Sequence, residues 1–294
     1  MDLPSALPQL LLTALALVMF GLGLSLSLDD FRRVLRHPKA VSVGLVLQVV
    51  VLPAACFGIV VAFDLPPVYA VGLMLLAASP GGVSANLFSH LFGGNVAMNV
   101  SLTAINTLVS IVTLPLIANW SIAHFERSGQ VVPLQLGKVA EVIAVVLVPV
   151  VLGMCVAAWR PAFAQRMERP FKAFSALVLA GFALIAIVRE RHALGDALDD
   201  LGPAVVLFNV LSLLAGYGLS RAAGLARPLA TAVAFEIGIH NATLSLYVAL
   251  SVLGNVQLAL PSALYSVSMY VTATVFGLLL VRTARRGDRR AAAG

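Results

Sequence analysis

Two long apolar runs, residues 68–91 and 228–253, constrain the fold of this chain most, because polar residues interrupt both of them. Each run is long enough to cross a bilayer, which takes roughly 20 residues. The second run carries Glu236, His240 and Asn241 near its centre. An ionisable group at membrane depth costs at least ~2.5–3.5 kcal/mol, and it usually persists where it faces a protein interior or a wet cavity and has a partner there. We therefore expect the rest of the chain to bring the two interruptions together.

The first run is broken by different chemistry. Its middle, residues 79–86, reads Ser-Pro-Gly-Gly-Val-Ser-Ala-Asn. Proline lacks the amide donor of a helix, glycine weakens one, and small polar residues follow them. Two interrupted spans at corresponding places in a membrane chain indicate the binding site of a transporter.

Composition places the chain in the membrane. Of its 294 residues 60% are apolar and only 11% are charged, whereas a soluble domain carries about 25% charged residues. The sequence therefore predicts an all-α polytopic membrane protein within one transmembrane domain, 1–294. The net charge of +6 is spread over alternate loops, which argues against nucleic acid as a partner. Cys56 and Cys155 both fall in apolar spans, where we expect buried thiols and neither a disulfide framework nor a metal site.

Nine transmembrane helices are predicted. No Lys or Arg precedes the first apolar run, so that run is expected to stay as a membrane helix and not to be cleaved as a signal peptide. The breaks between the runs carry turn residues or charge. The predicted spans are about 5–28, 40–63, 67–91, 95–119, 134–159, 171–189, 202–223, 228–253 and 258–282.

The basic residues predict the orientation, because cytoplasmic loops carry an excess of Lys and Arg. With the N-terminus outside, the inner loops and tail hold 15 of the 19 basic residues, and only Arg127, Lys138, Arg189 and Arg191 lie outside. We therefore expect a protein of the cell (inner) membrane with its C-terminus in the cytoplasm. The inner residues are Arg32, Arg33, Arg36, Lys39, Arg160, Arg166, Arg169, Lys172, Arg221, Arg227, Arg282, Arg285, Arg286, Arg289 and Arg290.

The two broken spans also indicate an internal repeat. They are the third and the eighth predicted spans, and an odd separation means that corresponding units cross the membrane in opposite directions. This is the pattern of an inverted repeat. Spans 1–4 would match spans 6–9, and the fifth span would have no counterpart.

The central candidate residue is Glu236, the one acidic residue at the centre of a predicted span. The alternatives to a cation ligand are a structural ion pair and a protonated carboxylic acid. No Lys or Arg lies at similar depth in any span, which argues against the ion pair and favours a mobile cation as partner. Asn86, Asn99 and Thr103 form a second group, with Asn99 and Thr103 four residues apart on one helix face. Hard cations such as Na⁺ prefer carboxylate, amide and hydroxyl oxygens, as Ca²⁺ and Mg²⁺ do. The alternative for these three is hydrogen bonding between helices.

Two further polar residues have open roles. Gln48 is a lone amide in the second span, and it could join a cation site or bond across helices. His240 could carry a proton, contact a substrate or be an inert polar contact, and its unperturbed pKa near 6.5 lies in the physiological range.

Three motifs resemble the bile acid:sodium symporter family: residues 79–82 (SPGG), 94–98 (GNVAM) and 236–241 (EIGIHN). The resemblance runs in order over most of the chain. It implies two discontinuous helices that cross at mid-membrane in a core domain, with a separate panel domain packed against it. The core would comprise spans within about 40–119 and 202–282, and the panel those within about 5–28 and 134–189. It also implies secondary transport of an organic anion driven by two sodium ions.

The resemblance assigns sodium ligands residue by residue. Asn86, Thr103 and Glu236 match the first site, and Asn99 stands where a serine is usual. Ala85 stands where a second serine is usual and offers no oxygen. For the second site, Gln48 matches, as do backbone carbonyls expected from Glu236, Ile237 and Ile239. His240 replaces the usual glutamine at the next position and offers a nitrogen, which sodium binds less well; a proton on His240 could replace that sodium.

The resemblance also locates the substrate. Asn241 matches a residue near it, Val83 replaces a usual threonine, and Met269 and Tyr270 replace polar residues. We expect the anion at the starts of two half-helices, near 82–84 (Gly82, Val83 and Ser84) and 240–241, because helix N-termini carry roughly +0.5 charge.

The sequence as a whole predicts a sodium-coupled, partly proton-coupled symporter of an organic anion such as a bile-acid-like sterol or a small carboxylate. The partners would be that anion, Na⁺, H⁺ and the lipid bilayer, with no cofactor beyond the coupling ion. An alternative is a non-transporting receptor or sensor that keeps the fold. An enzyme is not expected, since no catalytic dyad, paired Asp or zinc motif occurs at suitable spacing.

Overall fold

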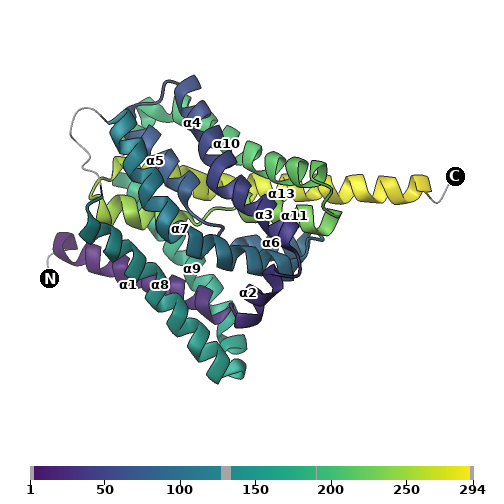
Figure 1. The fold of residues 1–294 in the computed structure, drawn as a ribbon. Helices are drawn as coiled ribbons and strands as arrows, with labels where there is room; N and C mark the ends of the chain where they lie inside the picture. Colours follow the sequence, from purple (N-terminus) through teal and green to yellow (C-terminus); the bar gives the residue numbers. More distant parts are fainter. Residues whose placement is uncertain (1–2, 127–133, 190, 292–294) are drawn as a thin grey trace.

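The computed structural model describes residues 3–126, 134–189 and 191–291, and these residues form a helical body (Figure 1). In the first half of the chain the helices are α1 (Leu3–Leu24), α2 (Leu28–Val34), α3 (Pro38–Val46), α4 (Leu52–Ala62), α5 (Pro67–Ala78), α6 (Ser84–Leu91) and α7 (Val96–Phe125). In the second half they are α8 (Leu136–Trp159), α9 (Pro161–Arg189), α10 (Arg191–Ala222), α11 (Arg227–Gly238), α12 (Ala242–Tyr247) and α13 (Leu260–Ala291). Wider π-helical turns, Leu47–Val51 and Val248–Val252, join α3 to α4 and extend α12, and a 3₁₀ turn, Gln257–Ala259, precedes α13.

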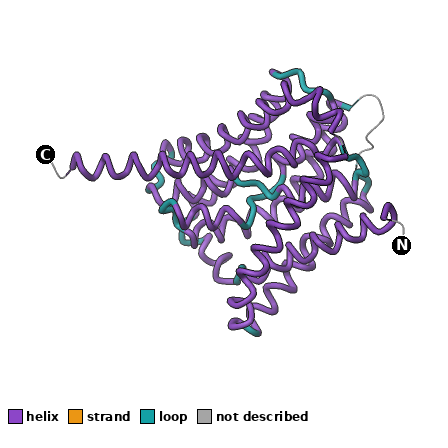
Figure 2. Tube along the Cα trace, turned by 180° about the vertical axis from the view of Figure 1, so that it is seen from behind, coloured by secondary structure: helices purple, strands orange, loops and turns teal. Residues whose placement is uncertain are grey.

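The two interrupted spans are broken helices, as predicted. Ser79 ends α5 in an extended conformation, with ψ 145°, because the following Pro80 disfavours helical geometry in the residue before it. In the second span α11 ends at Gly238, and Asn241 caps the next helix by accepting a hydrogen bond from the Leu244 amide at 3.1 Å. Figure 2 shows loop segments amid the helices as well as at their ends.

The membrane prediction is confirmed for the fold class. Within the described residues, five helices are long and apolar enough to cross a membrane, and four shorter apolar helices accompany them. Each of the nine predicted spans overlaps one of these segments. That all nine cross the membrane stays a prediction. The long helices are 38–62, 96–125, 137–159, 198–222 and 257–283, and the shorter ones are 12–24, 67–78, 173–185 and 242–252.

Two helices begin earlier than their predicted spans. The sixth and seventh predicted spans start at about 171 and 202, but α9 begins at Pro161, directly after the expected break at Arg160, and α10 begins at Arg191. These charged flanks are rich in Arg, Ala and Leu, which are good helix formers, so the helices continue beyond their apolar stretches. Cys155 was expected to be buried like Cys56, but it is exposed on α8. Arg127, one of the predicted outer basic residues, lies outside the described residues.

The helices fall into two groups. Figure 1 shows α1, α8 and α9 beside one another along one side of the body, and these helices contact one another directly. Gly23 and Gly153 bring α1 and α8 together so closely that a Cβ on either would strike the backbone of the other helix. Small residues allow such close packing in membranes, where no hydrophobic effect drives one helix against another.

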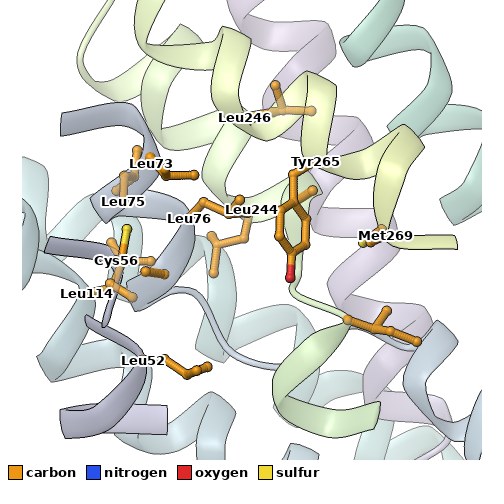
Figure 3. Packing of buried hydrophobic residues seen from close by; sticks show 14 of the residues in the cluster. Leu52, Cys56, Leu73, Leu75, Leu76, Leu114, Leu244, Leu246, Tyr265 and Met269 are labelled. Atoms are coloured by element: carbon orange, nitrogen blue, oxygen red, sulfur yellow. The ribbon is translucent and has the colours of Figure 1, made fainter. Parts of the chain in front are cut away.

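The remaining helices surround the two breaks with a dense apolar core. Tyr247, Tyr265, Phe208 and Phe235 are among its largest fully buried side chains. Figure 3 shows Tyr265 and Leu244 among leucines that belong to α4, α5 and α7. All residues from 68 to 82 and from 230 to 249 are buried, so both breaks lie in the interior.

The two halves of the chain match each other around the breaks. Both α5 and α11 are 12 residues long, and both have a proline in the first turn. Gly81 and His240 pair as an antiparallel bridge, so the two breaks run in opposite directions. These correspondences favour the predicted inverted repeat.

The topology makes a direct prediction: nine crossings place Arg285 in the cytoplasm and Leu3 outside. A C-terminal fusion of green fluorescent protein, which fluoresces only in the cytoplasm, should be bright, and a C-terminal alkaline phosphatase fusion should be inactive. The same pair of reporters at Gly94 serves as a control on an inner loop. Phosphatase activity of the C-terminal fusion would contradict the odd number of spans.

Candidate cation and substrate site

The two breaks satisfy each other's backbone groups. The Gly82 amide donates to the Ile239 carbonyl at 2.6 Å, and the Asn241 amide donates to the Pro80 carbonyl at 2.8 Å. Inside a membrane no water can satisfy such groups, so non-helical backbone is tolerated only where protein or a wet cavity surrounds it. The crossing therefore holds two irregular segments in the interior of the bundle.

Side-chain amides hold the carbonyls at the ends of the first half-helices. Gln48 Nε2 donates to the carbonyls of Ala77 at 3.2 Å and of Ser79 at 2.9 Å. On the opposite side Asn209 Nδ2 and the Tyr265 hydroxyl donate to the Gly238 carbonyl, at 2.8 and 2.9 Å. Sequence reasoning singled out Gln48 but missed Asn209 and Tyr265. A lone Asn within an apolar span was the signal available for Asn209.

The π-helical turn explains how Gln48 reaches the break. Pro53 follows the turn and lacks the amide that a regular α-helix would use there, so the helix widens before it. Such π-helical turns are frequent at functional sites.

Glu236 is fully buried at the crossing. Its Oε2 accepts a hydrogen bond from the Thr103 hydroxyl at 2.5 Å, and its Oε1 accepts one from Asn106 Nδ2 at 3.2 Å. The backbone of Gly81 lies against the same carboxylate. Among the described residues no Lys, Arg or His forms an ion pair with Glu236. The carboxylate thus has neutral donors only.

Free amide oxygens accompany this carboxylate. Asn99 Nδ2 donates to the Ala232 carbonyl at 2.7 Å, and its Oδ1 has no hydrogen-bond partner. The side-chain amide oxygens of Gln48, Asn86 and Asn106 are also buried and also have no hydrogen-bond partner. A buried polar atom without a partner costs ~1–3 kcal/mol. Sodium is a hard cation that takes such oxygens, so the residues present fit a sodium ion.

The predicted backbone ligands lie at the end of α11. Its last four carbonyls have no partner further along the helix, and Ile237 is among these residues. The Ile239 carbonyl follows the helix and accepts one hydrogen bond, from Gly82, which leaves its second lone pair free. Both residues are fully buried beside Glu236 in the chain.

His240 lies in an aromatic enclosure. Its ring stacks on Phe208 at 5.6 Å and meets Tyr265 edge-on at 5.4 Å. Nδ1 lies 3.1 Å from the Ser79 carbonyl, which can only accept, so Nδ1 carries the proton. Nε2 is buried and has no partner. Nδ1 is therefore engaged with the crossing, and only Nε2 is free for a ligand.

The structure brings all the predicted substrate residues to one small cavity of about 30 Å³. They are Gly82, Val83, Ser84, Asn241, Met269 and Tyr270. Val18 of α1 and Ser175 of α9 close the opposite wall, and the Ser84 and Tyr270 hydroxyls lie 3.1 Å apart. Pockets for drug-sized ligands are ≈ 300–1,000 Å³, so α1 and α9 must move away before an organic anion can enter.

A larger cavity of about 490 Å³ lies beyond α6. It is lined by Asn86 and His90 of α6, by Ser27 and Asp30 near α2, and by the adjoining ends of α8 and α9. In the predicted orientation this cavity faces the cytoplasm. Asn86, a predicted sodium ligand, is thus reached from that side.

Two broken helices that cross in the interior of a membrane protein, beside a buried carboxylate and free amide oxygens, are features of a secondary transporter. A family model described as the sodium bile acid symporter family matches residues 12–196. The chain belongs to this family, which confirms the resemblance seen in the motifs, and it is a sodium-dependent membrane transporter.

Named relatives agree with this class. The probable sodium/metabolite cotransporter BASS1, chloroplastic, of Arabidopsis thaliana is 29% identical over 280 residues, which cover 94% of this chain and 68% of the relative. The uncharacterized sodium-dependent transporter YocS of Bacillus subtilis (strain 168) is 30% identical over 257 residues, which cover 86% of this chain and 77% of that protein.

Substitution of Gly81 tests how closely the two broken segments approach each other. A Cβ there would overlap the Glu236 carboxylate, so Gly81→Ala must displace one of the two breaks. We expect a loss of about 1–3 kcal/mol, typical of overpacking, and a lower melting temperature of the purified protein in detergent. Gly58→Ala is the matched control, because nothing lies near its added methyl group. Equal melting temperatures for the two variants would contradict the close contact.

Proposed function

We propose that the chain couples sodium to the transport of a monovalent organic anion that binds at the crossing. The observation that carries this proposal is the charge of Glu236. It is buried, it has no basic partner among the described residues, and unpartnered amide oxygens lie around the crossing. A mobile cation would neutralise the carboxylate and use those oxygens. In this scheme α1, α8 and α9 are the panel, and the other helices are the core.

Two cation positions are proposed from the ligand types. The first uses Glu236 and Thr103 together with the amide oxygens of Asn86 and Asn99. The second uses Gln48 and the carbonyls near Glu236, Ile237 and Ile239. Each position offers oxygen atoms of the kinds that hard cations prefer. His240 adds no oxygen, and one of its ring nitrogens is already bonded to Ser79.

The substrate would be a carboxylate or a similar monoanion. Among the described residues no Lys or Arg lines the small cavity at Gly82 and Asn241. The negative charge would therefore be met by backbone amides at the start of α6, by hydroxyl groups such as that of Ser84, and by the cations. The names of the relatives refer only to a metabolite or to sodium dependence. A bile-acid-like sterol and a small carboxylate therefore both stay candidates, and transport across the cell membrane is part of the proposal.

A receptor that binds the same ligands without moving them is the alternative from another class. Uptake by proteoliposomes separates the two, because a receptor binds ligand and sodium but accumulates neither. A panel of radiolabelled carboxylates, tested with an inward sodium gradient and with choline in its place, would also identify the substrate class.

The role of Glu236 is tested by Glu236→Gln, which keeps the shape and removes the charge. We expect this variant to insert and fold but to lose accumulation against a gradient, because nothing then holds the coupling cation. Asp29→Asn is the control: it removes the charge of an exposed carboxylate on α2, where Asp29 pairs with Arg32 at 3.2 Å, and it should keep concentrative uptake. Undiminished accumulation by Glu236→Gln would show that Glu236 is structural.

Coupling to protons through His240 is a second candidate, favoured by the free Nε2. If a proton there replaces one sodium, the uptake rate should depend on pH, with about one sodium per substrate. His240→Gln should then flatten the pH profile and raise the affinity for sodium. The measurement is initial uptake against Na⁺ at several pH values for both proteins. Identical curves would leave the histidine without a coupling role.

A further inference from the structure

Two different residues of α7 approach the two oxygens of the Glu236 carboxylate. Thr103, a predicted ligand, donates to Oε2, and Asn106, which was not among the predicted ligands, donates to Oε1. Asn106 lies three residues beyond Thr103 on the same face of α7, and only 1% of it is exposed. The carboxylate can thus take part in two separate cation positions, one at each oxygen.

The amide of Asn106 has a defined orientation. A carboxylate only accepts hydrogen bonds, so Nδ2 must face Glu236 and Oδ1 must point elsewhere. That oxygen is buried and has no hydrogen-bond partner. An unpartnered amide oxygen next to a buried negative charge is unfavourable by itself, and a cation bound by both groups would offset its cost.

Asn106 lies level with Gln48. Gly44 packs against the Leu102 side chain, and Phe57 packs against Trp120 with ring centroids 5.4 Å apart. These two contacts show that α3 and α4 run alongside α7 in the same direction. Gln48 comes four residues after Gly44, as Asn106 does after Leu102. Gln48 and Asn106, whose side-chain oxygens have no partner, therefore lie at about the same level along two neighbouring helices.

Asn106 and Asn99 cannot serve the same cation. They are seven residues apart, which separates their backbones by about 10.5 Å along α7, and helical side chains lean toward the N-terminus, so both lean the same way. Oxygen ligands of one cation lie about 2.3–2.6 Å from it, hence within about 5 Å of one another. Asn106 therefore belongs to the position at Oε1.

We propose that Asn106 is a ligand of the second cation, which it binds through Oδ1 together with Gln48 Oε1 and Glu236 Oε1. It supplies the amide oxygen that is missing where His240 stands in place of a glutamine. The inference rests on the proposed coupling to sodium and adds a ligand to it. The second site is then complete without His240, and a proton on that histidine is not needed in place of sodium.

Sodium-dependent thermal stabilisation tests this assignment without a substrate. A ligand that binds only the folded state raises the melting temperature according to its affinity. The purified protein is titrated with NaCl against choline chloride at constant ionic strength, and the half-saturating concentration and the Hill coefficient are read from the melting temperatures. We expect Asn106→Ala to lower the Hill coefficient from above one to about one, and to raise the half-saturating concentration at least tenfold for the lost site.

Three variants accompany it. Ser110→Ala, one turn further along the same face, should leave the curve unchanged, because its hydroxyl already donates to the Thr107 carbonyl at 2.8 Å. Asn106→Leu removes the amide but keeps the same branched four-atom side-chain shape and leaves no cavity, so it should reproduce the sodium effect even if the smaller alanine loosens the core. His240→Gln added to Asn106→Ala should restore much of the lost affinity by returning an amide at position 240.

The outcomes that overturn the inference are distinct. Asn106 would be excluded from the site if both Asn106 variants gave the same sodium titration curve as the parent protein and Ser110→Ala. In that case a changed curve for Glu236→Gln under the same conditions would still support the proposed sodium coupling. Loss of all sodium stabilisation in both Asn106 variants would mean one shared position instead of two. No sodium effect on the parent protein would refute the proposed coupling and this inference together.

Discussion

The hydrogen bonds between the two broken segments are the interaction on which the rest of this structure depends. A break in a membrane helix exposes amides and carbonyls that lipid cannot satisfy, and each unpaired group costs several kcal/mol. Here the amides of Gly82 and Asn241 pair with carbonyls of the opposite break. Gln48, Asn209 and Tyr265 satisfy further carbonyls at the helix ends. The carbonyls near Glu236 and Ile237 at the end of α11 are not among those that these three side chains satisfy.

The same crossing concentrates polar groups without adding a positive charge. Gly81 has no side chain, so the Glu236 carboxylate can lie against its backbone. The amide donors of Gln48, Asn99 and Asn106 are used to support backbone or carboxylate, while their oxygens have no partner. The protein thus uses one end of each amide for its own structure and leaves the other end without a partner. If these oxygens bind the proposed cations, ion binding and the integrity of the crossing depend on the same residues.

The sequence predicted the fold class and the parts of the site that carry strong local signals. Proline and glycine at 80–82 and a carboxylate at 236 mark the breaks because both are costly in a membrane helix. Asn209, Tyr265 and Asn106 carried weaker signals, since a single amide or hydroxyl in an apolar span is also common in ordinary helix contacts. Their roles depend on which helices become neighbours, and periodicity within one helix does not specify that. The charged flanks of α9 and α10 lay outside the predicted spans because hydropathy reports where the membrane ends, whereas a helix can continue into water.

The two sides of the crossing differ in how far they are closed. The cavity of about 490 Å³ beside α6 reaches Asn86, whereas the predicted substrate residues enclose only about 30 Å³. On the opposite side α12 and the turn after it pack directly on α1 and α8, and the Tyr247 hydroxyl donates to Glu141 at 3.3 Å. The structure is therefore open on one side of the crossing and closed on the other. A transporter must never be open on both sides at once, so under the proposed function the contact between α12 and α8 would break when the α6 side closes. Because Glu141 also pairs with Lys138 at 3.0 Å, its charge keeps a partner in either state, so the closed side can open without leaving an unpaired carboxylate.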